Sequence, residues 1–236
     1  MDRSIRRIVK EKDEFAQGMG LTVEFLTEHR KQAIRCGIAG AAILLLVLGA
    51  IAYRSRQHAA RQAALTAASE IAQAPIGPPT GEALQFFPTE AARDVAAAKA
   101  LTEVVTKYRG SDEATIAEFY LGTQAAGEGK TPEAEKWLKS AAESGNANYA
   151  SLAKLSLADV YRWEGKTAEA EKLLRALMAK PTDFVSKDHA TVALAELFGS
   201  SKPDEARKLL DSLNTAGRPG IGRAVMNVMN ELPRSH

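Results

Sequence analysis

The fold rests on the stretch Leu157-Ala-Asp-Val-Tyr-Arg-Trp-Glu-Gly-Lys-Thr-Ala-Glu-Ala-Glu-Lys-Leu-Leu174. It aligns without a gap with 121–138, and with one residue fewer in the turn it aligns with 194–210. The alanine that the three copies share recurs every 36 residues, at Ala134, Ala170 and Ala206. This is close to the period of two antiparallel helices that stack repeatedly. The sequence therefore predicts an all-α fold, a helical-repeat solenoid.

Each copy pairs a large apolar residue with a very small one on its first helix. In the first copy the small residue is Gly122, and the other two copies have alanine there. A small residue lets the second helix approach closely; Ala134 does the same from the other side, and Leu138 fills the remaining space. Gly129 and Gly165 are predicted to form the turns between the two helices.

These residues resemble the tetratricopeptide repeat family, whose pattern combines Leu-Gly, an aromatic residue, a turn glycine, and then Ala, a large apolar residue and Ala. Tyr161 and Phe198 match the aromatic position, whereas Ala125 departs from it. Ala141 matches the second Ala. The resemblance covers about 100 residues. It implies a stack of helix pairs that binds other proteins.

The chain is predicted to have four parts. They are a cytoplasmic tail (1–35), a transmembrane helix (36–53), a helical extension with a Pro/Gly-rich connector (54–88) and the repeat domain (89–236). Repeats are expected near 115–150, 151–186 and 187–218, with a capping helix over 220–232. An earlier, divergent repeat is expected to end in a helix with apolar residues at Val95, Ala98, Leu101, Val105 and Tyr108.

An uncharged run extends from Cys36 to Tyr53, and about 18 residues are just enough to cross a bilayer as a helix. The 35 preceding residues and the length of the run are too great for a usual signal peptide, so we expect an uncleaved anchor. The tail contains eight Lys and Arg residues, which predicts a cytoplasmic N-terminus and a periplasmic or extracellular repeat domain. The segment 22–32 is either a helix at the membrane surface or a solvated helical extension.

Composition argues against several classes of function. The formal net charge is +2 and acids interleave with bases, so no nucleic-acid surface is expected. Cys36 lies in the apolar run, and the four histidines have no partners at ligand spacing, so no metal or cofactor site is expected. Gly129-Lys130-Thr131 lacks the first glycine of a phosphate-binding loop. The sequence predicts neither catalytic residues nor a small-molecule substrate, and therefore no enzyme.

The layout of a short tail, one span and helical repeats also resembles the periplasmic ancillary subunit of the SecYEG translocon, although the tail here lacks a strongly acidic start. This resemblance implies an inner-membrane scaffold that assists protein export. Its expected partners are the SecYEG translocon and periplasmic chaperones, to which it would hand over exported chains. The alternatives are a scaffold for cell-envelope assembly and a repeat adaptor that faces the cytosol.

Partners of such repeats usually bind in a groove lined by the first helix of each pair. By the family resemblance, the groove positions in this chain are Phe119, Thr123, Leu155, Asp159, Arg162, Trp163 and Glu196. Trp and Arg are frequent anchors of protein interfaces, so Trp163 beside Arg162 is the most informative pair. The alternative is that Trp163 packs over the turn against Leu173.

Overall fold

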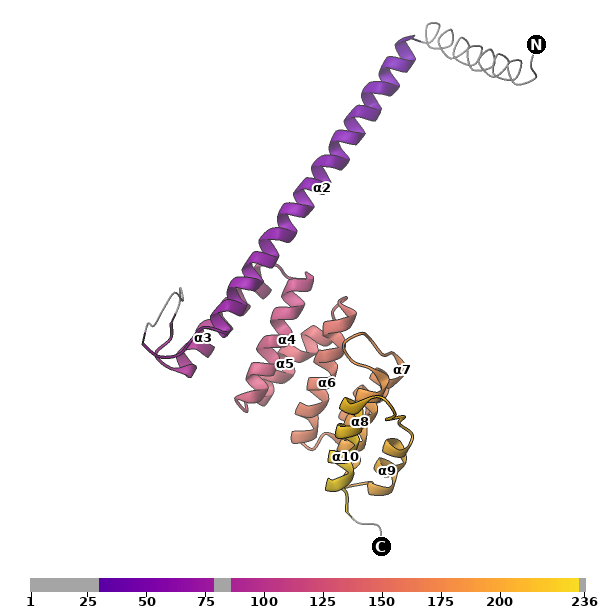
Figure 1. Ribbon diagram of the computed structural model, residues 1–236. Coiled ribbons are helices and arrows are strands. Elements are labelled where there is room, and N and C mark those ends of the chain that lie inside the picture. The colour runs from indigo at the N-terminus through magenta and orange to yellow at the C-terminus, as the bar shows by residue number, and fades with distance from the viewer. Residues whose placement is uncertain (1–29, 79–85, 234–236) are drawn as a thin grey trace, which may run out of the picture. The chain divides into compact units, whose positions relative to one another are not determined.

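The computed structural model describes residues 30–78 and 86–233, and every regular element within them is a helix (Figure 1). The predicted all-α fold is therefore confirmed. An isolated bridge between Ile76 and Phe87 joins the two ends of the connector. The chain divides into two compact units, residues 1–59 and 60–236, which are considered in turn.

The first unit contains the apolar part of helix α2 (Arg30–Ala72). An 18-residue window within Ile38–Ala72 has a mean hydropathy of 1.9, and none of it is buried. By length and composition, α2 could cross a membrane. The expected helix over 22–32 lies outside the described residues, apart from its last three, which begin α2.

The second unit contains the end of α2 and all the other described helices. α3 (Glu90–Lys107) precedes three helix pairs, and α10 (Pro219–Glu231) packs on α8 and α9. The pairs are α4 (Asp112–Gly127) with α5 (Thr131–Ala142), α6 (Ala147–Trp163) with α7 (Thr167–Ala179), and α8 (Lys187–Phe198) with α9 (Pro203–Asp211). Each helix packs on the next along the chain from α3 to α9, as a solenoid requires.

The first helix of each pair begins at a polar residue that caps it. The side chains of Ser111, Asn146 and Ser186 accept hydrogen bonds from the backbone N–H groups of Ala114, Tyr149 and His189, at 3.1–3.2 Å. Each cap satisfies an N–H group that the helix itself leaves without a partner. The caps therefore define where these helices begin.

A tight turn joins the two helices of each pair. Gly129 and Gly165 have φ angles of 73° and 74°, in the left-handed region that favours glycine, as predicted. The next residue in the first turn, Lys130, donates its backbone N–H to a carbonyl in the last turn of α4 at 2.8 Å. The third turn is one residue shorter: Lys202 donates to the carbonyl of Phe198, also at 2.8 Å.

The two helices of the first pair approach most closely at Gly122. A Cβ atom placed there would lie 2.6 Å from Cγ of Leu138 and 3.1 Å from its backbone nitrogen. Leu138 is fully buried, so it has little room to move. The later pairs accommodate Ala158 and Ala195 at this position, both nearly inaccessible to solvent.

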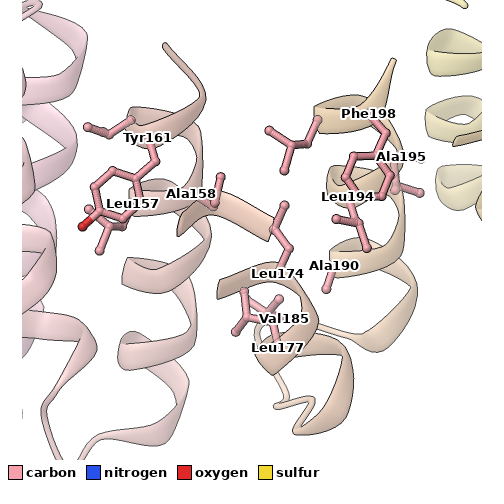
Figure 2. Packing of buried hydrophobic residues seen from close by; sticks show 14 of the residues in the cluster. Leu157, Ala158, Tyr161, Leu174, Leu177, Val185, Ala190, Leu194, Ala195 and Phe198 are labelled. Carbon is pink, nitrogen blue, oxygen red and sulfur yellow. The ribbon is translucent and has the colours of Figure 1, made fainter. Parts of the chain in front are cut away.

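The core of the repeats alternates large and small side chains across neighbouring helices. Figure 2 shows Leu174 of α7 between Ala158 of α6 and Leu194 of α8. The three repeat alanines, Ala134, Ala170 and Ala206, are each 0% exposed. The predicted role of these alanines, to let the helices approach, is consistent with this burial.

A second, smaller core joins the end of α2 to α3 and α4. It contains Ala68, Leu101 and Val104, each less than 5% exposed. Of the apolar residues noted in this helix, Leu101 is buried, whereas Val95 is 71% exposed. The core face of α3 passes through Ala97 and Leu101, and a residue two positions before Ala97 falls on the opposite side of the helix.

We expect Gly122→Ala to lower the free energy of unfolding by about 1–3 kcal/mol, because its methyl group would overlap the buried Leu138. Thermal unfolding followed by circular dichroism measures this change. Gly127→Ala is the matched control: it lies on the same helix with nothing within 4 Å of the added Cβ, and alanine favours helix. Equal melting temperatures for Gly122→Ala and the wild type would contradict the proposed packing constraint.

Candidate protein-binding surface

A hollow of about 390 Å³ lies between helices α6, α8 and α10. Leu155, Val192 and Val228 contribute apolar surface to it, while Asp159 and Glu196 contribute carboxylates. Its remaining lining residues are His189, Ala193, Ile221, Ala224, Asn227 and Glu231. The lining of the hollow is therefore largely apolar, and its acidic side chains outnumber its basic ones.

One arginine links the two acidic side chains of α6 and α8. The guanidinium of Arg162 lies 3.5 Å from Oδ1 of Asp159 and 3.4 Å from Oε1 of Glu196. Burial raises the pKa of Asp159, and the nearby Arg162 opposes this rise only in part. Arg162 therefore balances the negative charge of the Asp159 carboxylate only in part. A cation from a partner would stabilise this charged form further.

A second hollow, of about 450 Å³, lies between the end of α2, α3 and α4. Its lining includes Ala68, Leu101 and Tyr120, together with the predicted groove residue Thr123. This hollow has few charged side chains, Asp94 being the one among its lining residues. This second hollow therefore differs in chemistry from the hollow beside α6.

A row of aromatic rings connects the first two repeats to the loop before α8. The ring centroids of Phe119 and Tyr149 are 5.8 Å apart, and those of Tyr149 and Phe184 are 5.5 Å apart, both edge to face. Tyr120 packs beside Phe119 at 5.6 Å, and both Tyr120 and Phe184 are exposed. Of these four aromatic residues, only Phe119 was predicted to lie in the groove. Tyr149 and Phe184 lie near the caps Asn146 and Ser186 in the sequence, and this position was the signal that could have found them.

The structure brings together four of the seven predicted groove residues: Leu155, Asp159, Arg162 and Glu196. Thr123 lines the other hollow, and Phe119 belongs to the aromatic row. Trp163 ends α6 with 62% of its surface exposed and lines neither hollow. This exposure favours an outward ring over one packed against Leu173. The part these residues play in binding remains a prediction.

Metal binding finds no support in the part of the chain that the structure describes, where no three His, Cys, Asp or Glu side chains are grouped to hold an ion. Two of the four histidines, His29 and His236, lie outside the described residues. The side chains that this surface offers to a partner are apolar, aromatic and acidic.

A family model described as a tetratricopeptide repeat-like domain matches residues 31–208. The match begins at the start of α2, so it includes the apolar helix and the connector as well as the repeats. No curated protein and no solved structure matches the chain.

Substitution of Asp159 tests the electrostatics of the first hollow. A carboxyl whose pKa is raised by folding destabilises the folded state above that pKa, so Asp159→Asn should raise the melting temperature at pH 7. The rise should be at most about 1–2 °C, because the side chain is 47% exposed and solvent screens its charge. The difference should shrink as the pH falls through the raised pKa of the folded state, and it should disappear below the unfolded value of about 3.9, where the carboxyl is protonated in both states. Asp183→Asn, at an exposed loop position, is the control and should change little. A lower melting temperature for Asp159→Asn at pH 7 would contradict this electrostatic interpretation.

Proposed function

Because the chain belongs to the tetratricopeptide repeat-like domain family, we propose that it is a membrane-anchored scaffold that binds other proteins on the surface of α6, α8 and α10. Repeats of this kind mediate protein–protein interactions. The observation that carries the proposal is the hollow between these helices, where an apolar bed lies beside the partly buried Asp159 and the exposed Glu196.

The chemistry of the hollow favours one class of partner. An extended segment can place an apolar side chain against Leu155 and Val192 and a Lys or Arg side chain beside Asp159 and Glu196. The neighbouring aromatic row, with exposed rings at Tyr120 and Phe184, offers further apolar contact. The partner is therefore a protein segment with alternating apolar and basic residues. Such segments are exposed mainly before a protein folds.

We further propose that α2 anchors the chain in the inner membrane, with the tail in the cytoplasm and the repeats in the periplasm. The length and apolar composition of α2 support the anchor, and the eight basic residues of the tail support the orientation. In this orientation the scaffold assists protein export beside the SecYEG translocon and passes exported chains to periplasmic chaperones. The layout of tail, span and repeats supports this role.

A reporter fused after His236 tests the orientation. Alkaline phosphatase, which is active only after export, should be active there, and a cytoplasmic reporter at the same site should be inactive. The matched control is the same fusion to a chain in which Leu45 and Leu46 are replaced by Arg, because charges in the middle of the span oppose insertion. An active cytoplasmic reporter on the wild-type chain would reverse the topology and indicate the cytosol-facing adaptor.

Site-specific photocross-linking tests the binding surface. A photoreactive amino acid at Leu155 in the full chain should cross-link to translocon subunits or to newly exported chains in cells. We expect Asp159→Asn combined with Glu196→Gln to reduce the yield about tenfold or more, and Trp163→Ala to reduce it with no change in melting temperature because this ring is exposed.

The control site for cross-linking is Lys208, an exposed residue on α9. Equal yields at Lys208 and Leu155 would contradict a binding surface on α6, α8 and α10. Cross-links from Leu155 only to proteins of cell-envelope assembly would retain the scaffold and overturn the export role.

A further inference from the structure

We call the contact between the second helix of one pair and the first helix of the next pair a junction. At two junctions of the stack, α5 with α6 and α7 with α8, an aromatic ring lies between two cations. Lys139 and Lys166 lie 5.9 and 5.3 Å from the ring centroid of Tyr161. At the next junction, Arg175 and Lys202 lie 5.9 and 4.4 Å from the ring of Phe198. These distances allow cation–π attraction. In each case one cation lies on the second helix of the preceding pair (Lys139 on α5, Arg175 on α7). The other lies just after the turn that ends the helix carrying the ring (Lys166, Lys202).

A glutamate pairs with both cations at each junction. Glu135 binds Lys139 and Lys166 and accepts a hydrogen bond from the Tyr161 hydroxyl at 3.2 Å. Glu171 binds Arg175 at 2.8 Å and Lys202 at 3.6 Å. Hydrogen bonds from these cations lower the pKa of both glutamates. The glutamate and the two cations recur after 36 residues and the ring after 37, which shows that the arrangement belongs to the repeat.

At the junction of α3 and α4 the ring is missing, because Ala125 occupies the position of Tyr161 and Phe198. A hollow of about 620 Å³ opens at this position. Its apolar lining consists of Ala91, Val95, Ala98, Leu121 and Ala125. Val95 is 71% exposed, so apolar surface of α3 remains uncovered beside the hollow.

Of the two cations that flank the ring at the other junctions, this hollow has one, and its lining contains more acidic than basic residues. Lys130 corresponds in sequence to Lys166 and Lys202 and lines the hollow. It pairs with Glu128 at 2.6 Å. The other acids of the lining are Glu90, Asp94 and Glu133. Arg93 neutralises part of this charge through Glu90 and Asp94, and a net negative charge remains.

We propose that the hollow between α3, α4 and the start of α5 binds an aromatic side chain carried on a basic segment of a partner protein. The aromatic ring would occupy the space that Tyr161 and Phe198 fill at the other junctions, with Lys130 as the neighbouring cation. The acidic lining selects Lys or Arg beside that aromatic residue. The hollow shares no lining residue with the one between α6, α8 and α10, so this surface is independent of the proposed groove.

The test uses the full chain in detergent micelles and the peptide acetyl-Ser-Lys-(5-fluorotryptophan)-Arg-Ser-amide, observed by fluorine NMR. Every protein compared, the reference chain included, carries Asp159→Asn and Glu196→Gln, so that binding of the basic peptide between α6, α8 and α10 does not contribute to the signal. The reference chain should broaden and shift the fluorine signal saturably. Ala125→Tyr fills the hollow with the chain's own ring and should weaken binding at least about tenfold. Glu133→Gln, which removes one of the acidic charges of the lining, should weaken it about threefold. The same peptide with Glu in place of Lys and Arg should not bind.

Asp211→Asn, at an exposed position that lines neither hollow, is the matched control and should bind the peptide like the reference chain. Ala125→Phe is the second filling variant should Ala125→Tyr lose its helical circular dichroism. Equal binding by the reference chain and a folded filling variant, or no saturable change with the reference chain, would overturn the proposal. Sedimentation showing that the reference chain dimerises and the filling variants do not would also overturn it, by assigning the hollow to a second copy of the chain. None of these outcomes bears on cross-linking at Leu155.

Discussion

The close approach of the two helices within each pair is the constraint on which the rest of the domain depends. A residue no larger than alanine must stand where the helices meet, and in the first pair the contact with Leu138 leaves room only for Gly122. Once the helices lie this close, one long edge of each pair remains apolar and must be covered by the next pair. The stack therefore grows in one direction. α10 covers the last pair by packing on α8 and α9.

The repeats share this constraint but differ in how their junctions are filled. Aromatic rings, cations and glutamates close the two later junctions, whereas Ala125 leaves the first one open. At this first junction the side-chain amide of Gln124 donates to the backbone carbonyl of Asp94 at 3.1 Å, and hollows lie on both sides of this contact. The hydrophobic core is also divided into two clusters that meet at α4. Because it lacks the ring and the paired cations that close the later junctions, the α3–α4 junction should open more readily than the others.

The repeat period, the turn glycines and the small residue at each helix contact could be predicted from the sequence, because each depends on local geometry repeated three times. The face of α3 could not be assigned at Val95, because a single divergent helix offers no second copy to fix its register. The aromatic row was missed for another reason. Tyr149 and Phe184 come from different repeats, and only the stacking of the helices brings their rings together. The pairing of Arg162 with Glu196 across α6 and α8 is likewise a product of the stack, although both residues had been assigned to the groove.

The proposed anchoring in a membrane would change how tightly the proposed groove needs to bind its partner. An extended segment loses conformational entropy when it binds, so an open hollow with a few acidic groups should bind it weakly. A scaffold held beside the source of its partner meets that partner at an effective concentration that can approach about 1 mM. A dissociation constant of about 0.1 mM would then give about 90% occupancy, while still permitting rapid release. Under the proposed export role, a tight groove would retain its bound chains and prevent their transfer to a chaperone. The incompletely compensated charge of Asp159 fits this requirement, because it favours basic segments as a class without specifying one sequence.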